Sequence, residues 1–192
     1  MDLRTPGWKF TLTESNLKAV RCIRNPDREF KITDTYYDTE KLDMAQIDQR
    51  LRYRISLDTG WQMKIPNGQG GHVRVSDIDK IRSAFGLTEL CINSLRDAGY
   101  MKIMDIVSER ATYLTEDFII RTYSVDQKDL RYAVGEIVPR VMGQVLATDD
   151  RVMSFAGKHG IVVDEPRGIF AEYIRINRPD DFLVIKTIGT FK

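Results

Sequence analysis

The chain has 192 residues, of which 42% are hydrophobic and 30% are charged, as is typical of soluble globular domains. This length supports one well-buried core, or two small lobes at most, and no apolar run approaches the ~20 residues that a membrane span needs. The formal net charge is +1, so overall charge gives no indication of nucleic acid or of a membrane surface as a partner.

The N-terminal residues lack the basic-then-apolar pattern of a secretory signal peptide. The two cysteines, Cys22 and Cys91, lie far apart and are too few for a disulfide framework. Reduced, partly buried thiols are typical of proteins in a reducing compartment. We therefore expect a cytoplasmic protein.

The first half of the chain carries helix and strand signals in alternation. Apolar spacing predicts a helix from Thr13 to Arg24, and β-branched and aromatic residues predict a strand from Glu29 to Asp38. The segment from Arg50 to Leu57 alternates at period two and turns into a partner strand from Trp61 to Ile65. The glycines and proline of residues 66–71 then predict a loop.

The second half begins with helices and continues with strands. Ser76 is the predicted cap of a helix that ends at Gly86, and a further helix ends at Gly99. The later predicted elements are strands over 101–114, 118–125, 132–138 and 169–176, and helices over 149–158 and 180–186. Many strands joined by short turns, with helices outside them, predict an α+β fold on an antiparallel sheet that can close into a barrel.

Residues 50–55 (RLRYRI) are the most informative stretch for function. Alternation places the three arginines on one face of the strand and the residues between them on the other. On the partner strand, Gln62 and Lys64 share a face. If these faces coincide, several cations converge on one surface, and guanidinium groups bind phosphate oxygens bidentately. A solvated strand face is the alternative interpretation of the same pattern.

Residues 132–140 (YAVGEIVPR) contain one carboxylate, Glu136, which shares a face with Val138 and Arg140. A single strand glutamate is more often a salt-bridge partner than a metal ligand. Gly135, inside the predicted strand, indicates a bulge or the close approach of another backbone.

The histidines, cysteines and serines do not indicate a zinc site or covalent catalysis. His72 and His159 have no partner at a metal-ligand or triad spacing and are predicted to be surface residues. The sequence contains no cysteine–histidine zinc pattern, no nucleophile elbow and no glycine loop that cradles phosphate at the start of a helix. Covalent catalysis through serine or cysteine is therefore not indicated.

An ordered set of short motifs resembles the CYTH superfamily of triphosphate tunnel proteins. The motifs are residues 34–39 (DTYYDT), 51–54 (LRYR), 60–64 (GWQMK), 132–136 (YAVGE) and 177–182 (NRPDDF). The last two resemble the thiamine-triphosphatase branch. The resemblance implies a single domain over residues 1–192, built as an antiparallel eight-stranded β tunnel with helices packed outside. It also implies that basic side chains hold an organic triphosphate, and that acidic ones hold Mg²⁺ in active relatives.

The resemblance assigns roles to individual residues. The implied phosphate-binding residues are Lys9, Arg52, Arg54, Lys64 and Arg110. The implied metal ligands are Glu136 and Asp126.

The acidic residues depart from the family pattern. The family opens with a Glu-x-Glu-x-Lys strand, of which residues 5–9 (TPGWK) retain only Lys9. Val138 and Ser124 stand where acids are expected, and Ile169 stands where a lysine usually begins the final strand. Because Mg²⁺ is bound through carboxylates together with phosphate oxygens, a site with so few acids should hydrolyse poorly.

Three functional interpretations follow. The favoured one is a protein that binds a triphosphate or another small polyanion, without nucleic acid or membrane, and hydrolyses it weakly or not at all. The second is an active Mg²⁺-dependent thiamine-triphosphate hydrolase whose missing acids come from Asp2, Glu14, Asp126 or Glu172. The third is a non-catalytic scaffold. Separately, Trp8 either plugs the tunnel mouth or packs on the barrel exterior.

Overall fold

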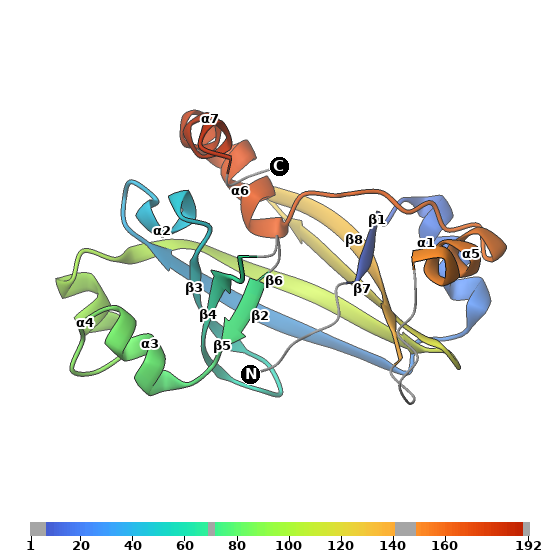
Figure 1. The fold of residues 1–192 in the computed structure, drawn as a ribbon, viewed down its shortest axis with the longest axis horizontal. Helices are drawn as coiled ribbons and strands as arrows, with labels where there is room; N and C mark the ends of the chain where they lie inside the picture. The colour runs from blue at the N-terminus through green and yellow to red at the C-terminus, as the bar shows by residue number, and fades with distance from the viewer. Residues whose placement is uncertain (1–6, 69–71, 141–148, 190–192) are drawn as a thin grey trace. The chain divides into compact units, whose positions relative to one another are not determined.

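The computed structural model describes residues 7–68, 72–140 and 149–189. Its eight strands form an antiparallel sheet in the order β1-β8-β7-β6-β2-β3-β4-β5 (Figure 1). The strands are β1 (Trp8–Thr11), β2 (Arg28–Asp38), β3 (Arg50–Ile55), β4 (Gly60–Pro66), β5 (His72–Val75), β6 (Met101–Leu114), β7 (Phe118–Gln127) and β8 (Leu130–Pro139). The helices are α1 (Glu14–Ile23), α2 (Asp43–Gln46), α3 (Ile78–Ala84), α4 (Ile92–Asp97), α5 (Asp149–Lys158), α6 (Ile169–Asn177) and α7 (Pro179–Thr187). The expected α+β class with an eight-stranded antiparallel sheet is confirmed.

The chain divides into two compact units. The β3–β4 unit holds the described parts of Ile32–Val107 and Tyr173–Lys192. The β7–β8 unit holds the described parts of Arg4–Lys31 and Ser108–Glu172. Strands β2 and β6 pass from one unit into the other. A single domain over residues 1–192 stays a prediction. None of the described helices is both long and apolar enough to cross a membrane.

In the β3–β4 unit, helices α3 and α4 cover one face of the strands. Tyr37, Leu51 and Met63, from three successive neighbours in the sheet, are buried there. Ile81 of α3 and Leu95 of α4 complete this core. Because side chains alternate along a strand, the residues between these apolar positions are directed to the opposite face.

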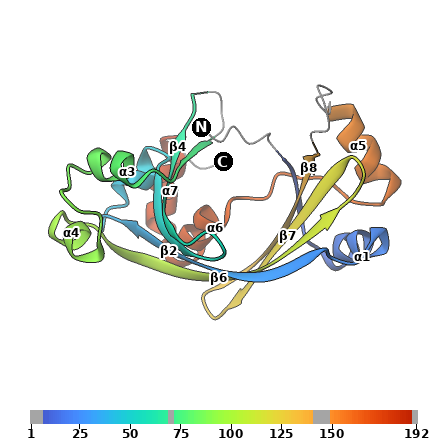
Figure 2. The ribbon, with the colours of Figure 1, turned by 90° about the horizontal axis from the view of Figure 1, so that it is seen from below.

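In the β7–β8 unit, helices α1 and α5 cover one face, and both lie beside the strands in Figure 2. Phe10, Ile120 and Ile137 supply the strand side of this core. Val20 of α1 and Val152 of α5 are fully buried against them. The opposite face again receives the alternate side chains of each strand.

The outer edge of β1 is covered by a single aspartate. The carboxylate of Asp164 accepts hydrogen bonds from the backbone N–H and the Oγ1 hydroxyl of Thr11, both at 2.6 Å. The backbone N–H of Asp164 donates to the carbonyl of Lys9 at 3.1 Å. The N–H of Thr11 and the carbonyl of Lys9, on the side of β1 away from β8, are therefore satisfied by this residue.

Residues 169–176 form helix α6, and the prediction of a strand there was wrong. The stretch is rich in β-branched residues, which favoured a strand. Its buried side chains are Phe170, Ala171 and Ile174, a spacing of one and three residues that is helical. Ile169, aligned with the lysine of a final strand, instead begins this helix.

The predicted cap of α3 was also wrong by one residue. Asp77, rather than Ser76, accepts hydrogen bonds from the backbone N–H groups of Asp79 and Lys80, at 3.1 and 3.2 Å. The short elements α2 and β5 were not predicted. The start of α2 depends on the end of β2, since the carboxylate of Asp38 accepts from the backbone N–H groups at positions 44 and 45. Burial raises the pKa of Asp38.

Gly135 lies where the ring of Phe10 crosses strand β8. The two residues pair directly in the β1–β8 ladder, and a Cβ atom on Gly135 would overlap the Phe10 ring. The close approach expected at Gly135 is therefore made by an aromatic side chain rather than by another backbone. This contact lets a fully buried ring pack between β1 and β8.

Gly135→Ala is therefore expected to lower the free energy of unfolding by about 1–3 kcal/mol, because the added methyl group overpacks the core. Urea unfolding followed by circular dichroism would measure the change. Gly157→Ala in α5 is the matched control, since a Cβ there meets open space and alanine should stabilise a helix interior by about 0.5–1 kcal/mol. Equal stability of the two variants would contradict this account.

Candidate functional site

Cross-strand pairing brings the predicted cations of the β3–β4 unit onto one sheet face. Arg50 pairs with Lys64, and Lys64 pairs in turn with Arg74. Arg52 pairs with Gln62, and residues directly opposite one another share a face. The expected coincidence of the two faces is confirmed. We call this surface the basic face, and it comprises Arg50, Arg52, Arg54, Lys64 and Arg74.

Two guanidinium groups of the basic face are buried around Asp34. Arg54 donates through Nε and Nη2 to the two carboxylate oxygens of Asp34, at 2.7 and 2.6 Å. Arg52 donates through Nη1 to the same carboxylate at 3.3 Å. Each arginine is 6% exposed and Asp34 is 4% exposed. Because buried charge is unfavourable unless paired, two cations around one carboxylate favour the arrival of an anion.

His72 is exposed, as predicted, and it lies beside an aspartate that the sequence analysis did not pair with it. Its Nε2 lies 2.9 Å from Oδ2 of Asp48, whose Oδ1 accepts from Nη2 of Arg50 at 2.9 Å. Asp48 adopts a left-handed backbone conformation, with φ of 57°. His72 pairs with Pro66 in the β4–β5 ladder and therefore alternates to the basic face.

In the β7–β8 unit, the strand face opposite helices α1 and α5 carries Glu136, and cations lie around it. We call this surface the polar face. Lys9 and Arg121 pair with Glu136 from the two neighbouring strands. Nη1 of Arg121 lies 3.6 Å from Oε2 of Glu136, and the Tyr123 hydroxyl donates to the same oxygen at 3.4 Å. The Arg110 guanidinium stacks 4.5 Å above the Tyr123 ring. Burial, followed by the charge of Glu136, raises the pKa of Tyr123.

The β7–β8 hairpin decides which side chains join Glu136. Its two-residue turn pairs odd-numbered residues of β7 with even-numbered residues of β8. Arg121 therefore lies beside Glu136, although it was not predicted. Asp126 alternates to the opposite face, where its side chain is 88% exposed and lies 3.4 Å from Arg131. The structure does not bring the two implied metal ligands together, and counting residues outward from the turn would have indicated both results.

Gly7 lies against Glu136, at the position where the family pattern expects a second glutamate. A Cβ atom on Gly7 would overlap the carboxyl group of Glu136. Val138 stands where another acid is expected. Among the described residues, no group of three or more His, Cys, Asp and Glu side chains could hold a metal ion. The side chains present therefore do not fit a preformed Mg²⁺ site.

The other acids considered for such a site do not change this conclusion. Asp2 lies outside the described residues. Glu14 is exposed in the first turn of α1, a helix that covers the apolar face. Glu172 lies in the first turn of α6. Within the part of the chain that the structure describes, neither glutamate belongs to a metal-binding group.

Trp8 packs with the core of the β7–β8 unit. It pairs with Ile137, and its indole lies against the cluster that α1 and α5 cover. Lys9 and Glu136 alternate to the opposite face. The hypothesis that Trp8 plugs a tunnel mouth was therefore wrong, and packing on the helix-covered side is what the structure contains.

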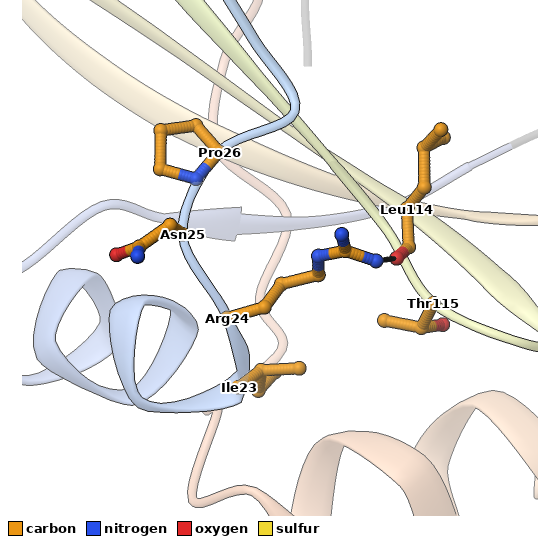
Figure 3. Close-up of a pocket in the computed structure, with 6 residues that line it drawn as sticks. All are labelled: Ile23, Arg24, Asn25, Pro26, Leu114 and Thr115. Atoms are coloured by element: carbon orange, nitrogen blue, oxygen red, sulfur yellow. Dashed lines mark hydrogen bonds between the residues drawn. The ribbon is translucent and has the colours of Figure 1, made fainter.

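An open pocket of about 510 Å³ lies where the segment after α1 meets the end of β6 (Figure 3). It is lined by Ile23, Arg24, Asn25, Pro26, Leu114 and Thr115. Arg24 supplies its only charged side chain, which donates to the carbonyl of Leu114 and, at 2.8 Å, to Asp27. None of the predicted site residues lines this pocket.

The family to which the chain belongs is now clear from its similarity to known proteins. Residues 9–138 match the model of the CYTH domain, and the chain is a member of the CYTH family. It is 27% identical over 190 residues to a thiamine-triphosphatase of Macaca fascicularis, covering 85% of this chain and 81% of that protein. It is 26% identical over 180 residues to the human thiamine-triphosphatase, covering 80% and 77%.

Solved structures share the fold. A protein of Bacillus halodurans described as a candidate adenylate cyclase superposes with a TM-score of 0.58 at 13% identity, covering 86% of this chain and 94% of that one. A Pyrococcus horikoshii protein superposes with a TM-score of 0.56 at 18% identity, covering 92% of this chain and 99% of that one. A candidate adenylyl cyclase from Hippeastrum, described as having a dominant triphosphatase activity, gives 0.57 at 14% identity, covering 87% and 93%. These likenesses confirm the tunnel-family fold expected from the sequence motifs.

Asp34 is buried and Asp126 is exposed, so replacing each of them should change the stability by different amounts. Asp34→Asn is expected to lower the free energy of unfolding by about 3–5 kcal/mol, because it leaves two buried guanidinium groups without their carboxylate. Asp126→Asn removes only an exposed ion pair and should change the free energy of unfolding by less than about 1 kcal/mol. Urea unfolding of both variants would test this, and similar losses would contradict the assigned burial.

Proposed function

We propose that this CYTH protein binds an organic triphosphate or another polyanion through its basic side chains, and hydrolyses it weakly or not at all. The observation that carries the proposal is the buried pair Arg52 and Arg54 around one carboxylate, on the same face as Lys64. Guanidinium groups match phosphate oxygens bidentately, and an ammonium group adds a compact charge. The proposed phosphate-binding residues are Lys9, Arg52, Arg54, Lys64 and Arg110.

The thiamine-triphosphatases that resemble the chain support an organic triphosphate as the ligand. The described triphosphatase activity of the Hippeastrum protein agrees with the same ligand class. On the polar face of the β7–β8 unit, Arg121 extends the proposed set of cations beyond those that the family pattern supplied. The free thiols of Cys22 and Cys91 fit the proposed cytoplasmic location.

Weak hydrolysis follows from the balance of charges rather than from the loss of a binding surface. In the strands of the β7–β8 unit, Glu136 is the one described carboxylate on the polar face, and it lies close to Arg121. Mg²⁺ is usually held by at least one or two carboxylates plus phosphate oxygens. With Gly7 and Val138 at the places of two family acids, the cations remain and two of the expected metal ligands do not.

The second candidate function is an active thiamine-triphosphate hydrolase. The 27% identity to a thiamine-triphosphatase over 85% of the chain favours it. In this candidate Mg²⁺ is the cofactor, and Glu136 and Asp126 are its proposed ligands. The separation of these two acids onto opposite faces of the β7–β8 hairpin weighs against it.

Calorimetric titration with tripolyphosphate would test binding. Arg52→Ala and Lys64→Ala are each expected to weaken the affinity by about 10- to 100-fold, because each removes charge-assisted hydrogen bonds to the anion. Arg131→Ala is the matched control, since that side chain is 89% exposed and should leave the affinity unchanged. Absence of binding by the wild type, or equal binding by all variants, would refute the proposed function.

Phosphate release from thiamine triphosphate, measured with and without Mg²⁺, would separate the two candidates. We expect little metal-dependent release, because loss of a single group that stabilises the transition state commonly lowers the rate by about 10²–10³. Rapid release that requires Mg²⁺ and disappears in Glu136→Gln would instead establish the hydrolase.

A further inference from the structure

The two buried arginines of the basic face are held by partners of different charge. Arg54 is held by the carboxylate of Asp34, through two hydrogen bonds of 2.7 and 2.6 Å. Arg52 is held mainly by the side-chain amide of Gln62, whose Oε1 accepts from Nε at 3.2 Å and from Nη2 at 2.7 Å. The contact of Arg52 with Asp34 is longer, at 3.3 Å.

Gln62 occupies the place that a carboxylate would take in a fork-shaped ion pair. A glutamate at this position could offer its oxygens to the same two donors of Arg52. The amide oxygen accepts the same hydrogen bonds without carrying a charge, and an arginine can only donate, which fixes the amide orientation. Arg52 also donates to the hydroxyl of Tyr36, at 3.4 Å, and this acceptor carries no charge.

Because Gln62 and Arg52 are buried, a neutral partner and a charged partner of Arg52 should differ strongly in their effect on anion binding. Gln62 is 7% exposed and Arg52 is 6% exposed. Water therefore screens the Arg52 charge poorly, and the interaction of one unit charge with an anion nearby is several times stronger than at an exposed site. Gln62 orients the guanidinium group while leaving its charge in place.

We propose that Gln62 is a specificity-determining residue, which makes the basic face prefer ligands with more phosphate groups. It adds no negative charge to that of Asp34, which Arg52 and Arg54 share, so the gain in affinity with each added phosphate charge is larger than a second carboxylate at position 62 would allow. The expected order is tripolyphosphate, then diphosphate, then monophosphate. This inference rests on the proposed binding of a polyanion and specifies the class of ligand.

The test is Gln62→Glu, titrated calorimetrically with monophosphate, diphosphate and tripolyphosphate. The introduced carboxylate compensates Arg52, so the affinity for tripolyphosphate should fall by about 10-fold or more. The affinity for monophosphate should fall less, and the ratio between the two ligands should shrink. The midpoint of thermal unfolding without ligand should stay the same or rise, because the two buried guanidinium groups, which share Asp34, gain a second carboxylate.

Two further variants separate charge from orientation. Gln62→Met removes the hydrogen bonds without adding a charge, so it should weaken all three ligands by similar factors and keep their ratio. Asn93→Asp, at an exposed position of α4, adds the same charge on the helix-covered side of the same unit and should change neither affinity nor ratio.

The outcomes distinguish the inference from the function on which it rests. A ratio of tripolyphosphate to monophosphate affinity that is the same in the wild type and Gln62→Glu would overturn the inference alone. The same ratio loss in Gln62→Met would also overturn it, because orientation rather than charge would then set the preference. Failure of the wild type to bind any of the three ligands would overturn the proposed function and the inference with it.

Discussion

The carboxylate of Asp34 holds two guanidinium groups inside the β3–β4 unit. The division of its strands into a basic face and an apolar face depends on this interaction. Asp34 pairs with Arg54 in the β2–β3 ladder, and Tyr36 pairs with Arg52. Leu51, next to Arg52 in the sequence, is fully buried on the face that α3 and α4 cover. A slip of one residue would move both arginines into that apolar core, so the buried ion cluster and the hydrophobic core specify the same register.

The two units differ in how their carboxylates are used. In the β3–β4 unit, Asp34 fixes arginines that point to the basic face, so the acid organises cations. In the β7–β8 unit, Glu136 lies near Arg121 and Tyr123 with Gly7 packed against it. Neither arrangement concentrates oxygen ligands for a hard divalent ion. Both arrangements are compatible with phosphate oxygens, which supply the negative charge that the side chains lack.

Much of the fold follows from period-two and helical spacing, which is why β3, β6 and α5 were predicted close to their observed bounds. The basic face was predictable for the same reason, since alternation and a hairpin place Arg52 and Lys64 together. Some contacts made by side chains outside the regular elements were not predictable. Helix α2 depends on the carboxylate of Asp38 at the end of β2, which hydrophobic spacing does not indicate. His72 meets Asp48, which is distant in the sequence, only once β5 pairs with β4. Matching Asp126 to a family motif by position overlooked the turn that decides its face.

The covering of β1 by Asp164 bears on how the protein behaves at high concentration. An open strand edge presents unpaired N–H and C=O groups that can template pairing with a strand of another molecule. Here the N–H of Thr11 and the carbonyl of Lys9 are already bonded to the 161–168 segment. A second molecule would have to displace Asp164 before its own strand could extend the sheet at β1, so this one residue opposes edge-to-edge pairing at that end of the sheet.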